Sequence, residues 1–155
     1  MGVDHLRSAP GTYALLLRAD TAQTIEVGAL GELAVRSGGY VYVGSAFGPG
    51  GVRARVHRHV RDDGATHWHI DYLRAVTTLA RVWWTHDDAR RECAWATALR
   101  DRRRATVPLR GFGASDCTCQ SHLMRMREET EPAAIRTALR AEAPVHGESA
   151  ESVTA

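Results

Sequence analysis

The chain has 155 residues, 44% of them hydrophobic, which suits a single globular domain built around one core. Its 20 basic residues, all arginine, stand against 18 acidic ones, so the net charge of +2 does not by itself indicate a nucleic-acid partner. Because the sequence contains no lysine, it excludes a Schiff-base lysine, a Walker lysine and a lysine general base. Arginine instead favours bidentate contacts with phosphate oxygens.

The cysteines and the hydropathy pattern indicate the cellular compartment in which we expect the protein. The 3 cysteines are an odd set, and the N-terminus lacks the basic-then-apolar pattern of a secretory signal. No apolar run approaches the roughly 20 residues that would span a bilayer. We therefore expect a cytoplasmic protein with reduced cysteines and no membrane span, present as a monomer or a weak dimer.

The first expected elements are strands. After a polar lead at residues 1–10, the apolar run 12–17 predicts a strand. Segments 24–27 and 32–35 alternate polar with apolar residues and are separated by glycines, which is typical of a hairpin.

Strict alternation continues in residues 40–44, so Tyr40 and Tyr42 are expected on one face of a third core strand. We expect Tyr40 to be a packing residue. A glycine-rich turn then leads into residues 52–61, where valine recurs at every fourth position, as on the buried face of an amphipathic helix.

The second half of the chain alternates helices with strands and ends in a polar tail. In chain order we expect a short helix at 67–75, a strand at 78–84, a helix at 88–102, a last strand at 121–126 and a helix at 132–142. Residues 143–155 are expected to lack order. Trp83 and Trp84 are adjacent on one expected strand, so one of them should form an exposed surface or contact the terminal helix.

Together these elements predict an α/β (α+β) domain, with a small mixed or antiparallel central sheet flanked by helices. The functional domain would span residues 11–126, followed by a C-terminal helix within 127–142 and a disordered tail at 143–155.

Two short motifs on separate expected strands resemble a known family. Residues 11–13, Gly-Thr-Tyr, and residues 42–44, Tyr-Val-Gly, are similar to the paired signatures of the GIY-YIG nucleases. They are followed, in the order of that family, by a helix carrying Arg55 and His59 and a helix carrying Glu92.

Longer strings narrow the resemblance. His-Trp-His-Ile-Asp-Tyr-Leu at residues 67–73 and Gly-Phe-Gly-Ala-Ser-Asp-Cys at residues 111–117 resemble a GIY-YIG-related family of unknown function that is sometimes fused to endonuclease III. The resemblance implies a GIY-YIG-like fold and a metal-dependent endonuclease that hydrolyses phosphodiester bonds in DNA, with a part in DNA repair.

In the implied mechanism a tyrosine assists the attack of water, and one Mg²⁺ or Mn²⁺ ion stabilises the leaving oxygen. Tyr13, Tyr42, Arg55 and His59 would be catalytic, and Glu92 would bind the metal.

The residue types agree with this chemistry. A phenol with a pKa of about 10 acts as a base only where positive charge stabilises its phenolate, which Arg55 could supply to Tyr13. Arg55 and His59 are one helical turn apart and therefore share a face. Glu92 borders an apolar helix face, where a carboxylate needs a partner such as Mg²⁺.

Other interpretations remain open. The arginines Arg53, Arg58 and Arg61 form either a solvated helix face or a set of contacts to the DNA backbone. Nearby thiol and imidazole groups could instead bind zinc, and the residues concerned are Cys117, Cys119 and His122, with His67, His69 or Cys93 as further ligands. The alternatives to an enzyme are a non-catalytic nucleic-acid-binding module on the same fold and a zinc-stabilised interaction protein.

Overall fold

The structure, a computed structural model, describes residues 6–61, 68–100, 105–113, 121–127 and 130–149. Its centre is a six-stranded sheet in the order β6-β7-β4-β1-β5-β8, in which every neighbouring pair is antiparallel. The strands are β1 Gly11–Ala19, β4 Gly38–Ala46, β5 Thr78–Thr85, β6 Ala105–Thr106, β7 Leu123–Met126 and β8 Gly147–Ser149. The expected fold class, an antiparallel sheet flanked by helices, is confirmed.

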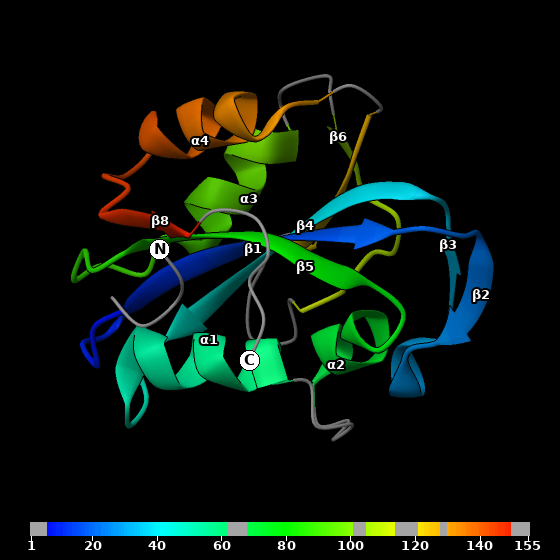
Figure 1. Ribbon diagram of the computed structural model, residues 1–155, viewed down its shortest axis with the longest axis horizontal. Coiled ribbons are helices and arrows are strands. Elements are labelled where there is room, and N and C mark those ends of the chain that lie inside the picture. Colours follow the sequence, from blue (N-terminus) through cyan, green and yellow to red (C-terminus); the bar gives the residue numbers. More distant parts are fainter. Residues whose placement is uncertain (1–5, 62–67, 101–104, 114–120, 128–129, 150–155) are drawn as a thin grey trace.

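Helices cover both faces of this sheet (Figure 1). Helices α1 Gly51–Arg61 and α2 His69–Arg74 lie on one side, and α3 Glu92–Arg100 and α4 Pro132–Arg140 lie on the other. Alternation along β1 sends Tyr13 to the core beneath α1 and Ala14 to the core beneath α3 and α4. The domain therefore has two apolar layers, one on each side of a single sheet.

The covered faces explain the two adjacent tryptophans. Trp83 and Trp84 are 0% and 6% exposed, because each side of β5 faces a core. The expectation that one of them forms an exposed surface was wrong. The alternative of contact with the terminal helix agrees with Trp83, which packs in the same cluster as Ile135 of α4.

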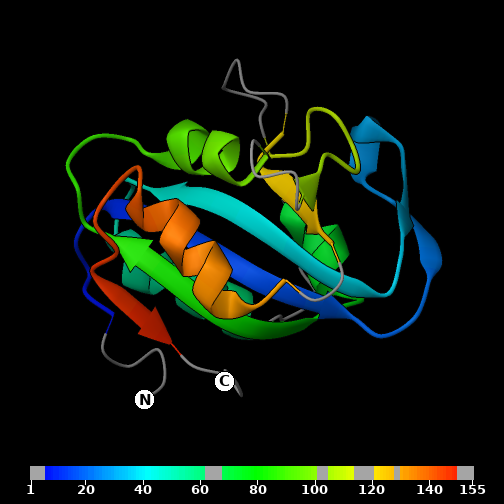
Figure 2. The ribbon, with the colours of Figure 1, turned by 90° about the horizontal axis from the view of Figure 1, so that it is seen from above.

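The expected hairpin is present as a separate two-stranded sheet, β2 Gln23–Glu26 with β3 Glu32–Val35, joined through a 3-10 helix at Gly28–Leu30. It projects at the end of the sheet away from the start of β1 and from β8 (Figure 2). Its inward residue Leu33 is buried and joins the core on the α1 side.

Helix α1 begins against the polar lead. The N–H groups of Val52 and Arg53 donate to the carbonyl oxygens of Ala9 and Arg7 at 3.0 and 3.1 Å, which satisfies two of the donors that a helix N-terminus leaves open. The expected valine stripe is confirmed as the buried face of α1, and it consists of Val52, Val56 and Val60.

The C-terminal segment corrects the expectation of a disordered tail. Gly147–Ser149 forms β8 and pairs with β5, and Glu148 binds Arg81 at 2.9 Å and Arg136 at 3.1 Å. The strand is polar, so composition alone did not indicate it. Its order comes from backbone pairing and from the close contact of Gly147 with the Trp84 ring. The two-residue strand β6 was also not expected.

None of the helices in the described residues combines the length and the apolar character needed to cross a lipid bilayer.

Candidate active site

The candidate site is built around a buried contact between a tyrosine and a histidine. Tyr13 on β1 faces α1, and its Oη atom lies 2.7 Å from Nε2 of His59. Both side chains are almost fully enclosed, with 1% and 2% exposure. The other ring nitrogen of His59, Nδ1, is buried and has no hydrogen-bond partner in the described part of the chain. The phenol and the imidazole therefore form an isolated pair in which a proton can be shared.

Glycine at position 44 makes room for Tyr13. Tyr13 and Gly44 are cross-strand partners, and a Cβ added at Gly44 would lie 2.5 Å from both Cζ and Oη of Tyr13. Gly11 is constrained in the same way by the carbonyl oxygen of Thr85 and by Val52. The glycines of the two sequence motifs thus allow close packing around the first tyrosine.

Tyr42 lies beside the pair on the neighbouring strand. Its ring centroid is 6.4 Å from that of Tyr13 and 6.2 Å from that of His59. Phe112 packs against it edge-on at 6.2 Å, and Gly113, with a φ of 68°, covers it so closely that a Cβ there would lie 2.9 Å from Cε1 of Tyr42. Tyr42 retains 9% exposure.

Burial keeps all three rings neutral. It raises the pKa of Tyr13 well above its usual value of about 10 and also raises the pKa of Tyr42. Burial lowers the pKa of His59 from 6.5 to about 3. The positive charge of Arg55 lowers the pKa of both tyrosines against this trend. A phenolate would therefore need positive charge beyond that of the free protein.

Arg55 and Arg58 share α1 but have different surroundings. Arg55 is half-buried, and its guanidinium carbon lies 4.4 Å from the centre of the Trp68 ring. Arg58 makes two parallel hydrogen bonds to Asp71, each 2.9 Å long. The possibility that Arg58 contacts DNA is not favoured, because its guanidinium fork already binds a carboxylate. Arg53 and Arg61 are exposed, as either interpretation of them requires.

Glu92 is the first residue of α3, on the opposite face from α1, but it stands where β1 begins and β4 ends. The preceding residues fix this place: Arg91 N donates to Thr12 Oγ1 at 3.1 Å, and Arg90 Nη1 lies 3.4 Å from Ser45 Oγ. The negative charge of Glu92 raises the pKa of Tyr42, where it is the largest contribution after burial, and also that of Tyr13. Its charge therefore acts on the two tyrosines from the end of the sheet.

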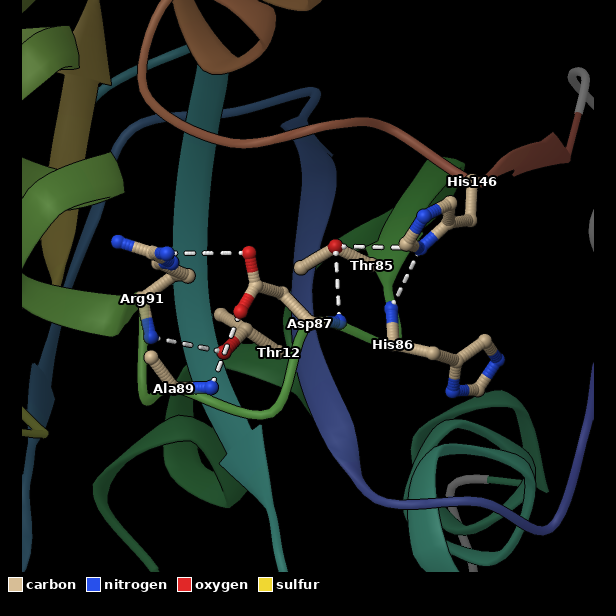
Figure 3. A network of polar contacts seen from close by, with 7 residues as sticks. All are labelled: Thr12, Thr85, His86, Asp87, Ala89, Arg91 and His146. Carbon is tan, nitrogen blue, oxygen red and sulfur yellow. Dashed lines mark hydrogen bonds and ion pairs between the residues drawn. The ribbon is translucent and has the colours of Figure 1, made fainter.

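The connection from β5 to α3 is held by a polar network (Figure 3). Asp87 accepts from Ala89 N and from Arg91 Nη2, both at 3.0 Å, and its N–H donates to Thr85 Oγ1 at 3.2 Å. The Ala89 N–H and the Arg91 guanidinium hold the pKa of Asp87 below its usual range. This turn uses residues that were expected to open a helix at position 88, so that boundary was wrong and α3 begins at Glu92.

The carboxylate of Glu92 is half-buried and makes no hydrogen bond or ion pair with a described residue. An oxygen ligand of this kind suits Mg²⁺ or Mn²⁺, which keep several waters and add phosphate oxygens. No group of three or more metal-ligating side chains occurs within the residues that the structure describes.

The possible zinc ligands are only partly placed. Cys117, Cys119 and His67 lie outside the described residues. His122 is buried, and its Nε2 is 3.7 Å from the sulfur of Cys93. Cys93 is disulfide-bonded, which differs from the reduced state expected from the sequence. An odd cysteine count does not tell whether two sulfurs come close enough in the fold to pair.

Sequence reasoning assigned no role to several residues at this site. Trp68, exposed by 37%, and Asp71 both lie beside α1, and Gly113 donates its N–H to Nδ1 of His69 at 2.9 Å. His69, named above as a further possible zinc ligand, accepts this backbone bond from a distant segment of the chain. The string at residues 67–73 indicated that this region matters without indicating how.

A family model described as a domain of unknown function, DUF123, matches residues 12–143. The chain belongs to this family. The matched span contains the two tyrosine strands, α1 and the beginning of α3. No curated protein and no solved structure matches the chain.

Proposed function

We propose that this protein is a GIY-YIG-type endonuclease that hydrolyses phosphodiester bonds in DNA with one divalent metal ion. The observation that supports it most is the 2.7 Å contact between Tyr13 Oη and His59 Nε2. A second phenol lies beside this pair, and the charges of Arg55 and Glu92 act on both phenols.

The pair provides a route for a proton. Water that attacks phosphorus gives its proton to Tyr13 Oη while the phenolic proton moves to His59 Nε2. Because Tyr13 is only 1% exposed, this step requires that substrate binding opens a path for water to its hydroxyl. His59 can accept the phenolic proton because burial leaves the imidazole neutral, with a pKa of about 3. The same low pKa opposes the transfer in the free protein, so the step requires the negative charge of a bound phosphodiester beside the imidazolium. Substrate binding and base strength are thus linked.

Arg55 supplies a fixed positive charge next to the tyrosines. Its N–H groups can donate to the non-bridging oxygens, where negative charge grows in the transition state. It also favours any phenolate character on Tyr13 and Tyr42. Arg55 therefore serves both the phosphate and the proton route.

Glu92 is the residue that would hold the metal. Its donor type and its lack of a partner among described residues fit a hard cation. A bound Mg²⁺ or Mn²⁺ ion supplies positive charge for the oxygen that leaves phosphorus. One carboxylate suffices when water and phosphate oxygens complete the coordination.

The test is a nicking assay on supercoiled plasmid and on branched DNA, with Mg²⁺ or Mn²⁺. Tyr13→Phe and Glu92→Gln are each expected to slow cleavage on the order of 100-fold or more. Tyr40→Phe is the matched control, because Tyr40 lies on the same face as Tyr42 and, among the described residues, its hydroxyl accepts one hydrogen bond, from Arg36 N at 2.9 Å. It should cleave at the wild-type rate.

The rival is a module that binds nucleic acid without cutting it. Binding of a labelled oligonucleotide with no cleavage in either metal, on either substrate, would favour this rival and contradict the proposal. Equal cleavage by wild type, Tyr13→Phe and Glu92→Gln would contradict it as well, since the activity would then arise elsewhere.

A further inference from the structure

Trp68 is the most exposed tryptophan of the chain and lies next to the candidate site. The other three are buried, at 0–6% exposure, whereas Trp68 is 37% exposed. Two guanidiniums lie over its ring, with their carbon atoms 4.4 Å from the centroid for Arg55 and 3.9 Å for Arg58. The His59 ring is 6.1 Å away. An exposed indole is thus used to hold two cations beside the Tyr13–His59 pair.

The buried carboxylate of Asp71 fixes this arrangement. It accepts from the backbone N–H of Trp68 at 2.8 Å and from both Nη atoms of Arg58 at 2.9 Å. Asp71 is only 8% exposed, so these charge-assisted bonds lie mostly out of water. One carboxylate therefore sets both the start of α2, where the indole sits, and the guanidinium that packs on the indole.

Arg55 and Arg58 differ in whether a nearby carboxylate balances their charge. The negative charge of Asp71 balances the positive charge of Arg58. Arg55, in contrast, makes no ion pair with a described residue. Arg55 shares a helix face with His59, and its field reaches both tyrosines. Of these two arginines, Arg55 is therefore the one whose positive charge is available to a ligand.

We propose that Trp68 is a positioning residue that holds the Arg55 guanidinium in place for a phosphodiester, with Arg58 and Asp71 as its rigid support. The proposal rests on the proposed nuclease function for the identity of the ligand. A long arginine side chain otherwise samples many rotamers, and stacking on an indole restricts them before the ligand arrives. Trp68 itself need not touch the ligand.

The first test does not depend on activity. Because the other tryptophans are buried, quenching of fluorescence by neutral acrylamide reports mainly on Trp68. Arg55→Ala should increase the quenching constant by uncovering the ring, and Arg53→Ala, an exposed arginine on the same helix, should leave it unchanged. An unchanged constant in Arg55→Ala would overturn the proposal, whatever the cleavage results.

The second test compares kinetics. Trp68→Ala should lower kcat about 10- to 100-fold, and Trp68→Phe, which keeps a flat ring under the guanidinium, should recover most of the loss. The double variant Trp68→Ala with Arg55→Ala should be no slower than Arg55→Ala alone. Additive losses would show that Trp68 acts on DNA independently of Arg55 and would overturn the positioning role.

The two proposals fail in different ways. If the wild-type protein binds DNA but never cleaves it, the nuclease function fails, and the same variants are compared for their affinity toward a phosphodiester oligonucleotide. Equal losses in the two single variants and the double variant support positioning by Trp68. Additive losses in affinity contradict it.

Discussion

Acid should destabilise this protein through His59. The folded protein holds this imidazole at 2% exposure, which lowers its pKa from 6.5 to about 3. The unfolded chain takes up the proton below about pH 6.5, but the folded chain does so only below about pH 3. The stability that the neutral ring provides is thus complete above pH 6.5 and is lost as the pH falls through the window from 6.5 to 3.

The size of the effect follows from the shift. Within that window each pH unit corresponds to roughly 1.4 kcal/mol of unfolding free energy. Lowering the pH from 7 to 5 should therefore remove about 2 kcal/mol through this one residue. For a domain with a total stability of about 5–15 kcal/mol, such a change is easily measured.

The assay is urea denaturation at several pH values between 5 and 8, for wild type and for His59→Gln. Glutamine keeps a polar group near Tyr13 Oη but does not titrate, so its stability should fall about 2 kcal/mol less over this range. His57→Gln, on the same helix, controls for loss of a helix histidine in general. Parallel curves for wild type and His59→Gln would refute the reasoning, because the buried ring would then accept its proton in the folded state.

Two glycine substitutions test close contacts elsewhere. Gly44→Ala places a Cβ 2.5 Å from the Tyr13 ring and should destabilise the fold by about 1–3 kcal/mol, whereas Gly39→Ala on the same strand, with its nearest neighbour at 3.5 Å, should cost less; similar urea midpoints would contradict this. Gly147→Ala should push β8 away from Trp84 and lower the thermal midpoint, with a red shift of tryptophan emission; an unchanged spectrum and midpoint would show that β8 does not cover that ring.

The sheet and its main helices are predictable because burial leaves a periodic record in the sequence. Alternation in β4 places Tyr40 and Tyr42 in the core beneath α1, as expected, and the valine stripe of α1 is buried as its spacing predicts. These features depend on which face of a helix or strand is buried. The spacing of apolar residues within each element indicates that face without reference to the rest of the chain.

The features that were missed depend on contacts between distant residues. Strand β8 is polar and short, and its order comes from pairing with β5, far away in the chain. Helix α3 starts late because residues 87–91 form a turn that a distant contact, Arg91 N to Thr12 Oγ1, holds against β1. In composition this turn resembles a helix start. No local pattern distinguishes these cases from a disordered tail or an acidic helix N-terminus.

At the candidate site, too, local patterns identified residues, whereas contacts between distant residues could not be predicted. The tyrosines, Arg55 and Glu92 were indicated by motif order, but their mutual geometry was not. Arg58 resembles its neighbours Arg53 and Arg61 in sequence, and only the position of Asp71 separates it from them. Trp68 lies just before a short helix, where no periodicity applies, so its stacking on two arginines required a structure.

His86 contacts two segments that are far apart in the sequence. Its ring Nδ1 lies 3.0 Å from the carbonyl oxygen of Pro10. Its backbone N–H donates to Nδ1 of His146 at 2.7 Å (Figure 3). The lead into β1 and the approach to β8 therefore meet at His86. One histidine therefore ties the edge strand β8 to the lead before β1, so a change at His86 should loosen both segments together.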